Sequence, residues 1–345
     1  MELPLPWPLP PMLGKLAREL PREGVLYEPK WDGFRCLALR DGDEVDLRSR
    51  HGNPLARYFP ELVEGMLALP GRRFVIDGEI VPRNGDFPAL MARLHPADSR
   101  VERLRRETPA AFVVFDVLAE GDAALLDLPF VQRRERLEAL LADARPPVFL
   151  TPATDDVAEA AAWLERFEGV IAKRRDLEYE PGRRVMVKVK RDRTADCVVA
   201  GLRWRVDRPL PSSLLLGLYD AAGALQHVGV ASSFGVRRAE ALLDDLRPLV
   251  VPLEGHPWEH GFLVGGGPIG RLRGAAGRWT PEMTMDWTPV APTRVAEVAY
   301  DQVDSDRFRH PARFRRWRLD RDPRSCTFEQ LELGTPELED VLARR

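Results

Sequence analysis

The sequence is poor in cysteine and contains no long apolar run. Cys36, Cys197 and Cys326 are the only three cysteines among 345 residues, and no two of them form a C-x-x-C pair. This argues against a disulfide framework and against a zinc site, and it fits a reducing cytoplasm. No apolar run approaches the roughly 18 residues of a membrane span. The N-terminal stretch "MELPLPWPLPPML" lacks a basic region and is rich in proline, so it predicts an extended lead-in and not a signal peptide.

The sequence also has no strong net charge. The formal net charge is −3 at pH 7, which by itself does not indicate a nucleic-acid partner. Two segments depart from this balance: residues 183–193 hold six basic residues and one acid, and residues 306–324 hold eight arginines and three aspartates. Such runs are either solvated surface or parts of a directed phosphate-binding face, and composition alone leaves both readings open.

The length of the chain predicts two domains, each with its own core. In the first part, β-branched and aromatic runs alternate with helical patterns, which predicts an α+β domain. We expect a hairpin that turns at Asp41-Gly42, buried strands over 72–81 and 110–118, and a helix over 129–144 with Pro129 at its first position. Thr154 is expected to cap the helix that follows.

The sequence pattern changes at about Cys197, where predicted short strands separated by turn residues begin. With one helical pattern over 235–246, this spacing predicts a small β-barrel. We place the boundary near residues 190–193, which gives domains over 1–190 and 191–345. The glycine-rich stretch 265–279 lacks the Lys-Ser/Thr pair of a P-loop. We expect it to be a mobile surface loop, with DNA contact as the alternative.

The stretch "YEPKWDGFR" raises the question of why a lysine stands inside a short apolar run. It contains the pattern K-x-D-G-x-R, formed by Lys30, Asp32, Gly33 and Arg35. A lysine attacks only as the free amine, and apolar and cationic neighbours disfavour its ammonium form. Gly33 would let the backbone turn closely around a ligand, and Arg35 offers a planar donor fork to phosphate or ribose oxygens. The pattern predicts a nucleophile in a nucleotide site.

Other chemistry-bearing residues follow in order along the first part of the chain. They are Arg50 in "LRSRHGN", Asp77-Gly78-Glu79 in "VIDGEIV", Phe115-Asp116 in "FVVFDVL", Glu168 and Lys173 in "FEGVIAKR", and Lys188 and Lys190 in "MVKVKR". Because side chains alternate along a strand, Lys188 and Lys190 are expected to point the same way.

With these stretches the sequence resembles the covalent nucleotidyltransferases, and within them the ATP-dependent DNA ligases. The stretches match motifs I, Ia, III, IIIa, IV and V of that family in order, and the resemblance extends over residues 24–325. The late stretch "RFRHPARFRRWRLDRDPRSCTFEQLE" is similar to motif VI and the tail of the small C-type ligases of actinobacteria. The resemblance implies an α+β adenylation domain (nucleotidyltransferase, ATP-grasp-like) over 1–190, followed by an OB-fold barrel over 191–345 that carries motif VI.

The resemblance implies a catalytic set formed by Lys30, Asp32, Arg318 and Asp320, with Lys30 as the adenylated nucleophile. Motif VI departs from the family at one position, because many ligases have lysine where this chain has Arg321. Arginine keeps the charge but is not equivalent at a phosphate site, so the handling of pyrophosphate is in question.

The resemblance also implies a set of nucleotide-binding residues. They are Glu28 for the adenine, Phe115 stacked on it, Arg35 and Glu79 for the ribose, Lys188 and Lys190 for the α-phosphate, Arg50 for the 5′-phosphate of a nick, and Lys173 and Arg184 as further residues facing the nucleotide. Glu168 would ligate the catalytic metal together with Glu79 or Asp32.

The resemblance therefore predicts an ATP-dependent DNA ligase that seals nicks through a lysine–AMP intermediate and serves DNA repair. Its implied cofactors are ATP and Mg²⁺ or Mn²⁺. Its implied partner is nicked double-stranded DNA, and a monomeric enzyme in the cytoplasm, associated with the nucleoid, is expected. RNA ligases and mRNA-capping nucleotidyltransferases share the first chemical step and are one alternative. A non-catalytic DNA-end-binding module is another, although pure binding would not require the lysine and carboxylate set.

Overall fold

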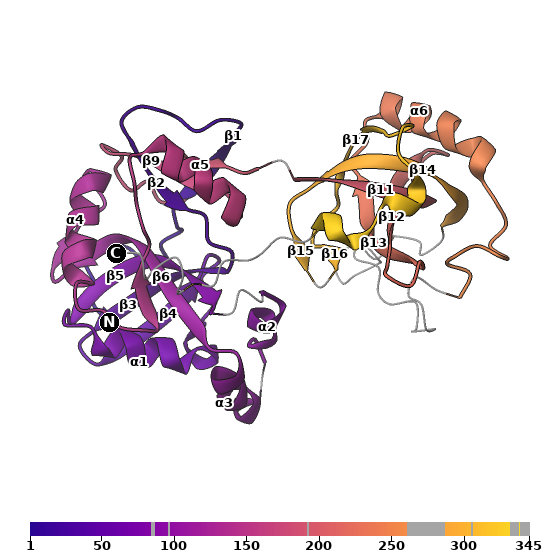
Figure 1. Cartoon of the computed structure of the whole chain (residues 1–345). Helices are drawn as coiled ribbons and strands as arrows, with labels where there is room; N and C mark the ends of the chain where they lie inside the picture. Colours follow the sequence, from indigo (N-terminus) through magenta and orange to yellow (C-terminus); the bar gives the residue numbers. More distant parts are fainter. Residues whose placement is uncertain are drawn as a thin grey trace. The chain divides into compact units, whose positions relative to one another are not determined.

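The computed structural model of the chain describes residues 1–83, 87–95, 97–191, 193–260, 287–304, 306–331 and 338. The chain forms two compact units, Met1–Arg191 with Gly334–Arg345, and Asp192–Leu333 (Figure 1). The strands are mostly antiparallel and the helices pack around them, so the predicted α+β class is confirmed. Over the described part of the chain, no helix has the length and apolar character needed to cross a membrane.

The first unit contains a six-stranded sheet in the order β4-β3-β5-β6-β7, with β8 also paired to β6. The strands are β3 (Phe34–Asp41), β4 (Glu44–Ser49), β5 (Arg73–Pro82), β6 (Ala110–Glu120), β7 (Ala123–Ala124) and β8 (Val148–Leu150). The predicted hairpin is present, and Gly42 adopts the positive φ of +64° that its turn requires. The register of β3 against β5 places Arg35 opposite Glu79.

Helices pack against the sheets of the first unit. They are α1 (Pro60–Ala68), which follows the 3₁₀ turn η1 (Ala56–Tyr58), α2 (Phe87–Ala92), α3 (Asp98–Glu107), α4 (Phe130–Leu140) and α5 (Val157–Arg166). Of these, α5 packs against the second sheet of the unit, described below. Leu62 and Met66 of α1 and Leu137 of α4 are fully buried against the apolar side chains of β5 and β6. This packing fixes the positions from which β3, β5 and β6 present their polar residues.

A second, four-stranded sheet in the first unit has the order β1-β10-β9-β2. Its strands are β1 (Leu13–Ala17), β2 (Val25–Pro29), β9 (Val170–Arg174) and β10 (Arg184–Val189). The N-terminal stretch that we predicted as a lead-in thus contributes β1, which pairs in parallel with β10. Apolar side chains alone did not reveal this strand, because its partner lies far along the sequence.

The second unit is a five-stranded sheet in the order β13-β12-β11-β14-β17. The strands are β11 (Arg193–Trp204), β12 (Pro211–Tyr219), β13 (Leu225–Ser232), β14 (Thr288–Tyr300) and β17 (Arg313–Trp317), and the short pair β15 (Val303–Asp304) and β16 (Arg307–Phe308) lies outside it. Ala312, just before β17, exchanges backbone hydrogen bonds with Val230 and Ser232 at 2.8 and 3.1 Å, which closes the sheet into a barrel.

One α-helix, α6 (Val236–Leu246), is described in the barrel unit, where the sequence predicted it. Short 3₁₀ turns follow it and end the described barrel: η2 (Arg247–Leu249), η3 (Pro323–Ser325) and η4 (Phe328–Leu331). The glycine-rich stretch 265–279 lies outside the described residues, so its prediction as a loop stays a prediction.

Two predicted helix starts were wrong in detail. Pro129 is the N-cap of α4 and not its first residue. Asp156, not Thr154, caps α5, because its Oδ1 accepts a hydrogen bond from the N–H of Ala158 at 2.8 Å. The hydroxyl of Thr154 instead accepts from the N–H of Asp156. Both Thr and Asp side chains can cap a helix, and the conformation of the local turn determines which of the two does so here.

A buried ion pair joins α4 to the centre of the six-stranded sheet. Arg133 is fully buried and donates to both carboxylate oxygens of Asp116 on β6, at 2.8 and 3.1 Å. It also donates to the carbonyl oxygen of Leu177 at 2.9 Å, so the two charges and most of their hydrogen-bonding capacity are matched inside the protein.

We expect Arg133→Leu to lower the free energy of unfolding of the first unit by about 3–5 kcal/mol, because Asp116 would be left as an uncompensated buried charge. Urea unfolding followed by circular dichroism measures this. Arg136→Leu is the matched control on the same helix. Arg136 pairs with Glu120 at 3.2 Å in a half-exposed position, so its loss should cost less than about 1 kcal/mol. Equal effects of the two substitutions would contradict the prediction.

Candidate active site

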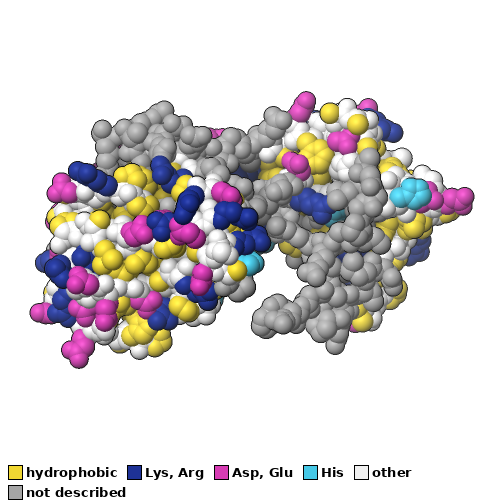
Figure 2. Space-filling model, turned by 90° about the horizontal axis from the view of Figure 1, so that it is seen from below, with side chains coloured by type: hydrophobic (Ala, Val, Ile, Leu, Met, Phe, Trp, Pro, Cys, Tyr) yellow, Lys and Arg dark blue, Asp and Glu magenta, His cyan; other side chains and the backbone are white. Residues whose placement is uncertain are grey.

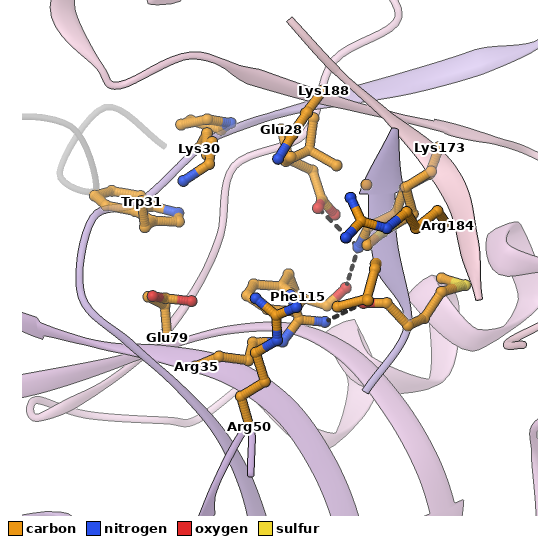
Figure 3. Close-up of a pocket in the computed structure, with 16 residues that line it drawn as sticks. Glu28, Lys30, Trp31, Arg35, Arg50, Glu79, Phe115, Lys173, Arg184 and Lys188 are labelled. Atoms are coloured by element: carbon orange, nitrogen blue, oxygen red, sulfur yellow. Dashed lines mark hydrogen bonds and ion pairs between the residues drawn. The ribbon is translucent and has the colours of Figure 1, made fainter. Parts of the chain in front are cut away.

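A cavity of about 300 Å³ in the first unit is lined by residues from both sheets. Most of the residues singled out in the first unit meet here: Glu28, Lys30, Arg35, Arg50, Glu79, Phe115, Lys173, Arg184 and Lys188 (Figure 3). Its volume is in the range of small-ligand sites. In Figure 3, Lys30, Trp31 and Glu79 lie on one side, and Glu28, Lys173 and Arg184 lie on the other.

Lys30 follows β2 and is held at the cavity by its backbone. Its N–H donates to the carbonyl oxygen of Gly169 at 2.9 Å, which fastens the loop beside Glu168. Gly33 then passes so close to β5 that a Cβ on it would stand 1.9 Å from the carbonyl oxygen of Ile80. No other residue type fits there without moving the backbone, which explains the glycine of K-x-D-G-x-R.

Glu168 binds both lysines at this end of the cavity. Its Oε2 forms an ion pair with Lys30 and its Oε1 with Lys190, while its side chain is only 8% exposed. Burial opposes the ionised form, but the two lysines outweigh burial and lower the pKa of Glu168. Glu168 is therefore ionised and paired at neutral pH.

Glu79 on β5 faces the same region, but its pKa is raised, whereas that of Glu168 is lowered. Burial raises its pKa to about 7, against the attraction of Lys30 and Arg35, and the negative charges of Asp32 and Glu168 add to the rise. Burial is thus the dominant influence on Glu79, and the neighbouring cations do not cancel it. Among the described residues, no group of three or more His, Cys, Asp or Glu side chains is arranged to hold a metal ion by itself.

The far end of the cavity is built around Glu28, which is 2% exposed. Its Oε2 pairs with Lys173 at 2.8 Å, and Lys173 donates to the carbonyl oxygen of Phe115 at 2.9 Å. The other oxygen of Glu28, Oε1, is buried without a hydrogen-bond partner. Oε1 faces the guanidinium of Arg134 at 3.5 Å, so the carboxylate of Glu28 is flanked by two cations. Lys173 therefore lies at this end and anchors Glu28.

Arg35 is locked by Asp77 on β5. The two groups form a bidentate ion pair with both N–O distances at 2.6 Å, and the guanidinium carbon lies 4.4 Å from the centre of the Phe115 ring. The hydroxyl of Tyr179 donates to Asp77 at 2.6 Å and accepts from the N–H of Met12 at 3.0 Å. One buried carboxylate thus fixes Arg35 and, through Tyr179, the N-terminal wall of the cavity.

The cations expected at the phosphates surround the remaining wall. Burial lowers the pKa of Lys188, and the charges of Lys190 and Lys30 lower it further. Gly14 lies against Lys188, since a Cβ there would come within 3.3 Å of the lysine Cβ. Arg50 follows β4 and lines a second, adjoining cavity of about 610 Å³ as well. The alternation of side chains along a strand predicted that Lys188 and Lys190 point the same way. Their placement fits this prediction, because both side chains reach the region of Glu168 and Lys30.

Arg318 and Asp320 lie in the barrel unit and bind each other. Arg318 donates to both oxygens of Asp320, at 3.0 and 2.8 Å, and to Asp196 on β11 at 2.9 Å. The hydrogen bond from Arg318 lowers the pKa of Asp320 to about 2. Arg321, the residue that departs from the family pattern, stands 3.6 Å from Asp196. Arg318 and Asp320 form one charge cluster with Asp196.

The two basic segments are partly neutralised where the structure describes them. Arg316 pairs with Glu297 at 2.8 Å, and Arg318 with its aspartates. On the face drawn in Figure 2, Lys and Arg side chains are interspersed with Asp and Glu over the first unit, and a group of Lys and Arg gathers at one edge. The surface is locally basic without being basic throughout, as the net charge requires.

Sequence reasoning missed several residues of the site. The cavity is also lined by Met12, Leu13, Gly14, Pro29, Trp31, Ile171 and Met186. Asp77 and Tyr179 act behind the lining by holding Arg35 and the N-terminal wall. In the barrel unit, Asp196 holds Arg318. Asp77 belongs to the Asp-Gly-Glu pattern and could have been assigned. The N-terminal residues carried no signal, because only the pairing of β1 with β10 brings them to the site.

A lysine paired with a glutamate at one end of a nucleotide-sized cavity, and a barrel carrying a motif VI cluster, define a covalent nucleotidyltransferase. Comparison with known proteins gives the family: the chain belongs to the ATP-dependent DNA ligases. The family model for the ATP dependent DNA ligase domain matches residues 11–190, and that for the ATP dependent DNA ligase C terminal region matches residues 207–321.

Curated relatives span the whole chain. DNA ligase C2 of Mycolicibacterium smegmatis is 49% identical over 342 residues, covering 96% of each protein. DNA ligase C of Mycobacterium tuberculosis is 45% identical over 356 residues, covering 99% of each. A solved chain from a study of Lig E DNA ligases covers 89% of this chain and 98% of that one with a TM-score of 0.53 and 17% identity, which shows the fold alone.

These findings confirm the predicted family, the adenylation and OB-like architecture and the assignment as a DNA ligase enzyme. Use of ATP follows from the family. They favour neither the RNA ligase or capping alternative nor a non-catalytic module. The roles of individual residues are taken up below as proposals.

The raised pKa of Glu79 predicts a pH-dependent stability. The folded state binds the Glu79 proton more tightly than the unfolded chain does. The wild-type protein should therefore lose stability relative to Glu79→Gln as the pH rises from below 4.5 through about 7, with an upper limit on the order of 3 kcal/mol. Thermal melts of both proteins at about pH 5 and about pH 8 measure this. Glu19→Gln, at an exposed position, is the control. The prediction would be refuted if the wild type lost stability relative to Glu79→Gln as the pH fell instead of as it rose.

Proposed function

We propose that this ligase seals 3′-OH/5′-phosphate nicks in duplex DNA through AMP carried on Lys30. One observation carries the proposal: Lys30 and its partner Glu168 stand at one end of a cavity whose other end is lined by the buried Glu28. A nucleotide whose base donates to Glu28 would place its phosphates toward Lys30, Lys188 and Lys190.

In the first step, the Nζ of Lys30 attacks the α-phosphorus of ATP. A nitrogen–phosphorus bond forms, the bond from the α-phosphorus to the bridging oxygen breaks, and pyrophosphate leaves. Lys30 must give up its proton and its ion pair with Glu168 to attack. Lys188 and Lys190 stabilise the charge that develops on the α-phosphate. Phe115 and Glu28 would position the adenine, and Arg35 and Glu79 the ribose.

The carboxylates of the site fit a magnesium ion held together with phosphate oxygens. Mg²⁺ is usually bound by one or two carboxylates plus substrate phosphates, so a full cage of protein ligands is not required. Glu168 would be the main ligand, with Glu79 or Asp32 beside it. The raised pKa of Glu79 is the structural sign that this region accepts further positive charge. When bound, the ion would polarise the phosphate; Mn²⁺ could serve in its place.

In the second and third steps, AMP moves to the 5′-phosphate at the nick, and the 3′-hydroxyl then displaces AMP and joins the strand. Arg50 would bind the 5′-phosphate from the rim of the cavity. Arg184 would face the nucleotide. The basic segments would contact the DNA backbone, which makes binding sensitive to salt. A role in DNA repair fits a ligase of this kind.

We further propose that residues 1–190 act as the adenylation domain and 191–345 as the OB domain. Motif VI would assist the first step when the OB domain closes over ATP, with a hinge near Arg191 to Thr194. The enzyme would act as a monomer in the cytoplasm, in association with the nucleoid.

We expect Lys30→Ala to abolish covalent labelling by ATP, because the proposed chemistry requires the amine of Lys30 and assigns Lys188 and Lys190 to the charge on the α-phosphate. Incubation with magnesium and α-labelled ATP followed by a denaturing gel checks this. Lys15→Ala, which removes an exposed lysine of β1, should label like the wild type. A labelled Lys30→Ala protein would show that the nucleophile is wrong. Pyrophosphate treatment beforehand removes AMP already present on purified protein.

The acceptor is tested separately. The labelled enzyme should seal nicked DNA duplexes much faster than nicked RNA duplexes. Labelling by GTP as readily as by ATP would favour the capping alternative, and preferential sealing of RNA would favour an RNA ligase.

Arg318→Ala and Asp320→Ala should slow self-adenylation more than they slow the sealing of nicked DNA that is already adenylated. The reason is that the proposed closed form, in which these residues act, belongs to the first step. The two rates are measured in separate single-turnover assays. Arg316→Ala is the matched control, since Arg316 is an exposed neighbour paired with Glu297. Equal losses in both assays would exclude a role confined to the first step.

A further inference from the structure

Arg134 on α4 is a buried arginine that the mechanism above does not use. It is 6% exposed and lies behind the cavity, not among its lining residues. Its Nη2 donates to the carbonyl oxygen of Thr151 at 2.8 Å, and its Nε donates to Glu138 at 2.7 Å. Its Nη1 stands 3.5 Å from Oε1 of Glu28. One guanidinium therefore reaches the residue proposed to bind the base.

The surroundings of Glu28 contain a small set of charges. Lys173 from β9 pairs with its Oε2, and Arg134 from α4 faces its Oε1. Asp116 from β6 is the one carboxylate that acts on it, and Asp116 is itself matched by Arg133. Of the two cations, only Arg134 faces Oε1, the oxygen without a hydrogen bond. Nη1 of Arg134 also has no hydrogen bond, so the two atoms interact through charge without a direct hydrogen bond.

Arg134 is also connected to the nucleophile loop. Thr151 is fully buried, and its hydroxyl accepts a hydrogen bond from Nε1 of Trp31 at 2.9 Å. Trp31 follows Lys30 and packs edge-on against Phe167, which precedes Glu168. Arg134 thus supports both ends of the cavity: one arm acts on Glu28 and the other on the carbonyl of the residue that holds Trp31.

We propose that Arg134 is a positioning residue that keeps Glu28 an ionised, acceptor-only group and thereby selects purines with an amine, not a carbonyl, at position 6. This rests on the proposed function, in which Glu28 meets the base. An ionised carboxylate can accept from a 6-amino group but cannot donate to a 6-carbonyl oxygen, which it repels. A protonated carboxyl group can donate to that oxygen.

The direction of the effect follows from the charges around Glu28. Burial is the largest influence and raises the pKa of Glu28; Lys173 and Arg134 oppose this rise without cancelling it. Removing Arg134 leaves burial and Asp116 opposed by Lys173 alone, so the pKa rises further. The neutral form of Glu28 then gains weight as the pH falls, and the 6-carbonyl purine gains while the 6-amino purine loses.

ATP and ITP are suitable probes, because ATP carries an amine at position 6 and an unprotonated N1, whereas ITP carries a carbonyl at position 6 and an N1–H. Binding is measured by isothermal titration calorimetry in a Lys30→Ala background, where no covalent step occurs, at about pH 6 and about pH 8. With Arg134 intact we expect a strong preference for ATP at both pH values. Arg134→Met should reduce this preference by about 10- to 100-fold, with the larger reduction at the lower pH.

Two further variants separate charge from packing. Arg134→Lys keeps the positive charge and should largely restore the preference. Arg136→Met, on the exposed side of the same helix, should leave it unchanged. If Arg134→Met does not fold, Arg134→Gln tests the same loss of charge with a polar side chain. A folded Met or Gln variant with an unchanged, pH-independent ratio of ATP to ITP binding would overturn the proposal, as would a Lys variant that behaves like Met.

The test also distinguishes this inference from the proposed function. If the protein with Arg134 intact does not prefer ATP to ITP, then Glu28 does not read the base and the proposed pose of the nucleotide fails. If it prefers ATP and the Arg134 variants retain that preference, the pose stands and only the role of Arg134 fails.

Discussion

The double ion pair of Glu168 is the interaction on which the chemistry of this protein depends. A single buried carboxylate forms ion pairs with both Lys30 and Lys190 and holds both at the end of the cavity. The same pairing keeps Lys30 unreactive, because a lysine in an ion pair is not a nucleophile. Glu168 therefore serves the resting state and the reacting state in opposite ways. Whatever cation it binds in place of Lys30 releases the amine at the point where phosphate arrives.

At the opposite end of the cavity, Glu28 is a second buried carboxylate with different surroundings. Glu28 is buried between two cations: Lys173 binds one carboxylate oxygen, and Arg134 faces the other at 3.5 Å without a hydrogen bond. In the proposed function this carboxylate meets the base of the nucleotide. The rigidity of the cavity comes from residues behind the lining, Arg134 for Glu28 and Asp77 for Arg35. The two sheets supply the frame, and buried ion pairs set the positions of the side chains that face the nucleotide.

The sequence allowed much of this to be predicted, for identifiable reasons. The strands β3, β5 and β6 and the helix α6 have strong local periodicity, and Lys30, Glu79, Glu168 and Lys188 stand in compact patterns whose chemistry is specific. The failures were non-local. The strand β1 is recognisable only through its partner β10, and Tyr179 acquires its role only when folding brings it to Asp77. The cap of α5 went to Asp156 because neighbouring Thr and Asp residues compete on equal local terms.

The pairing of β1 with β10 has a consequence for synthesis of the chain. Leu13 leaves the ribosome well before its partner Arg184, which emerges only after the whole six-stranded sheet and its helices. At elongation rates of roughly 5–20 residues per second this delay is on the order of ten seconds. During that time β1 exposes an unpaired edge, and the cavity lacks one wall. The nucleotide site is thus the last part of the first unit to be completed, so nascent chains acquire nucleotide binding late, after their main core has formed.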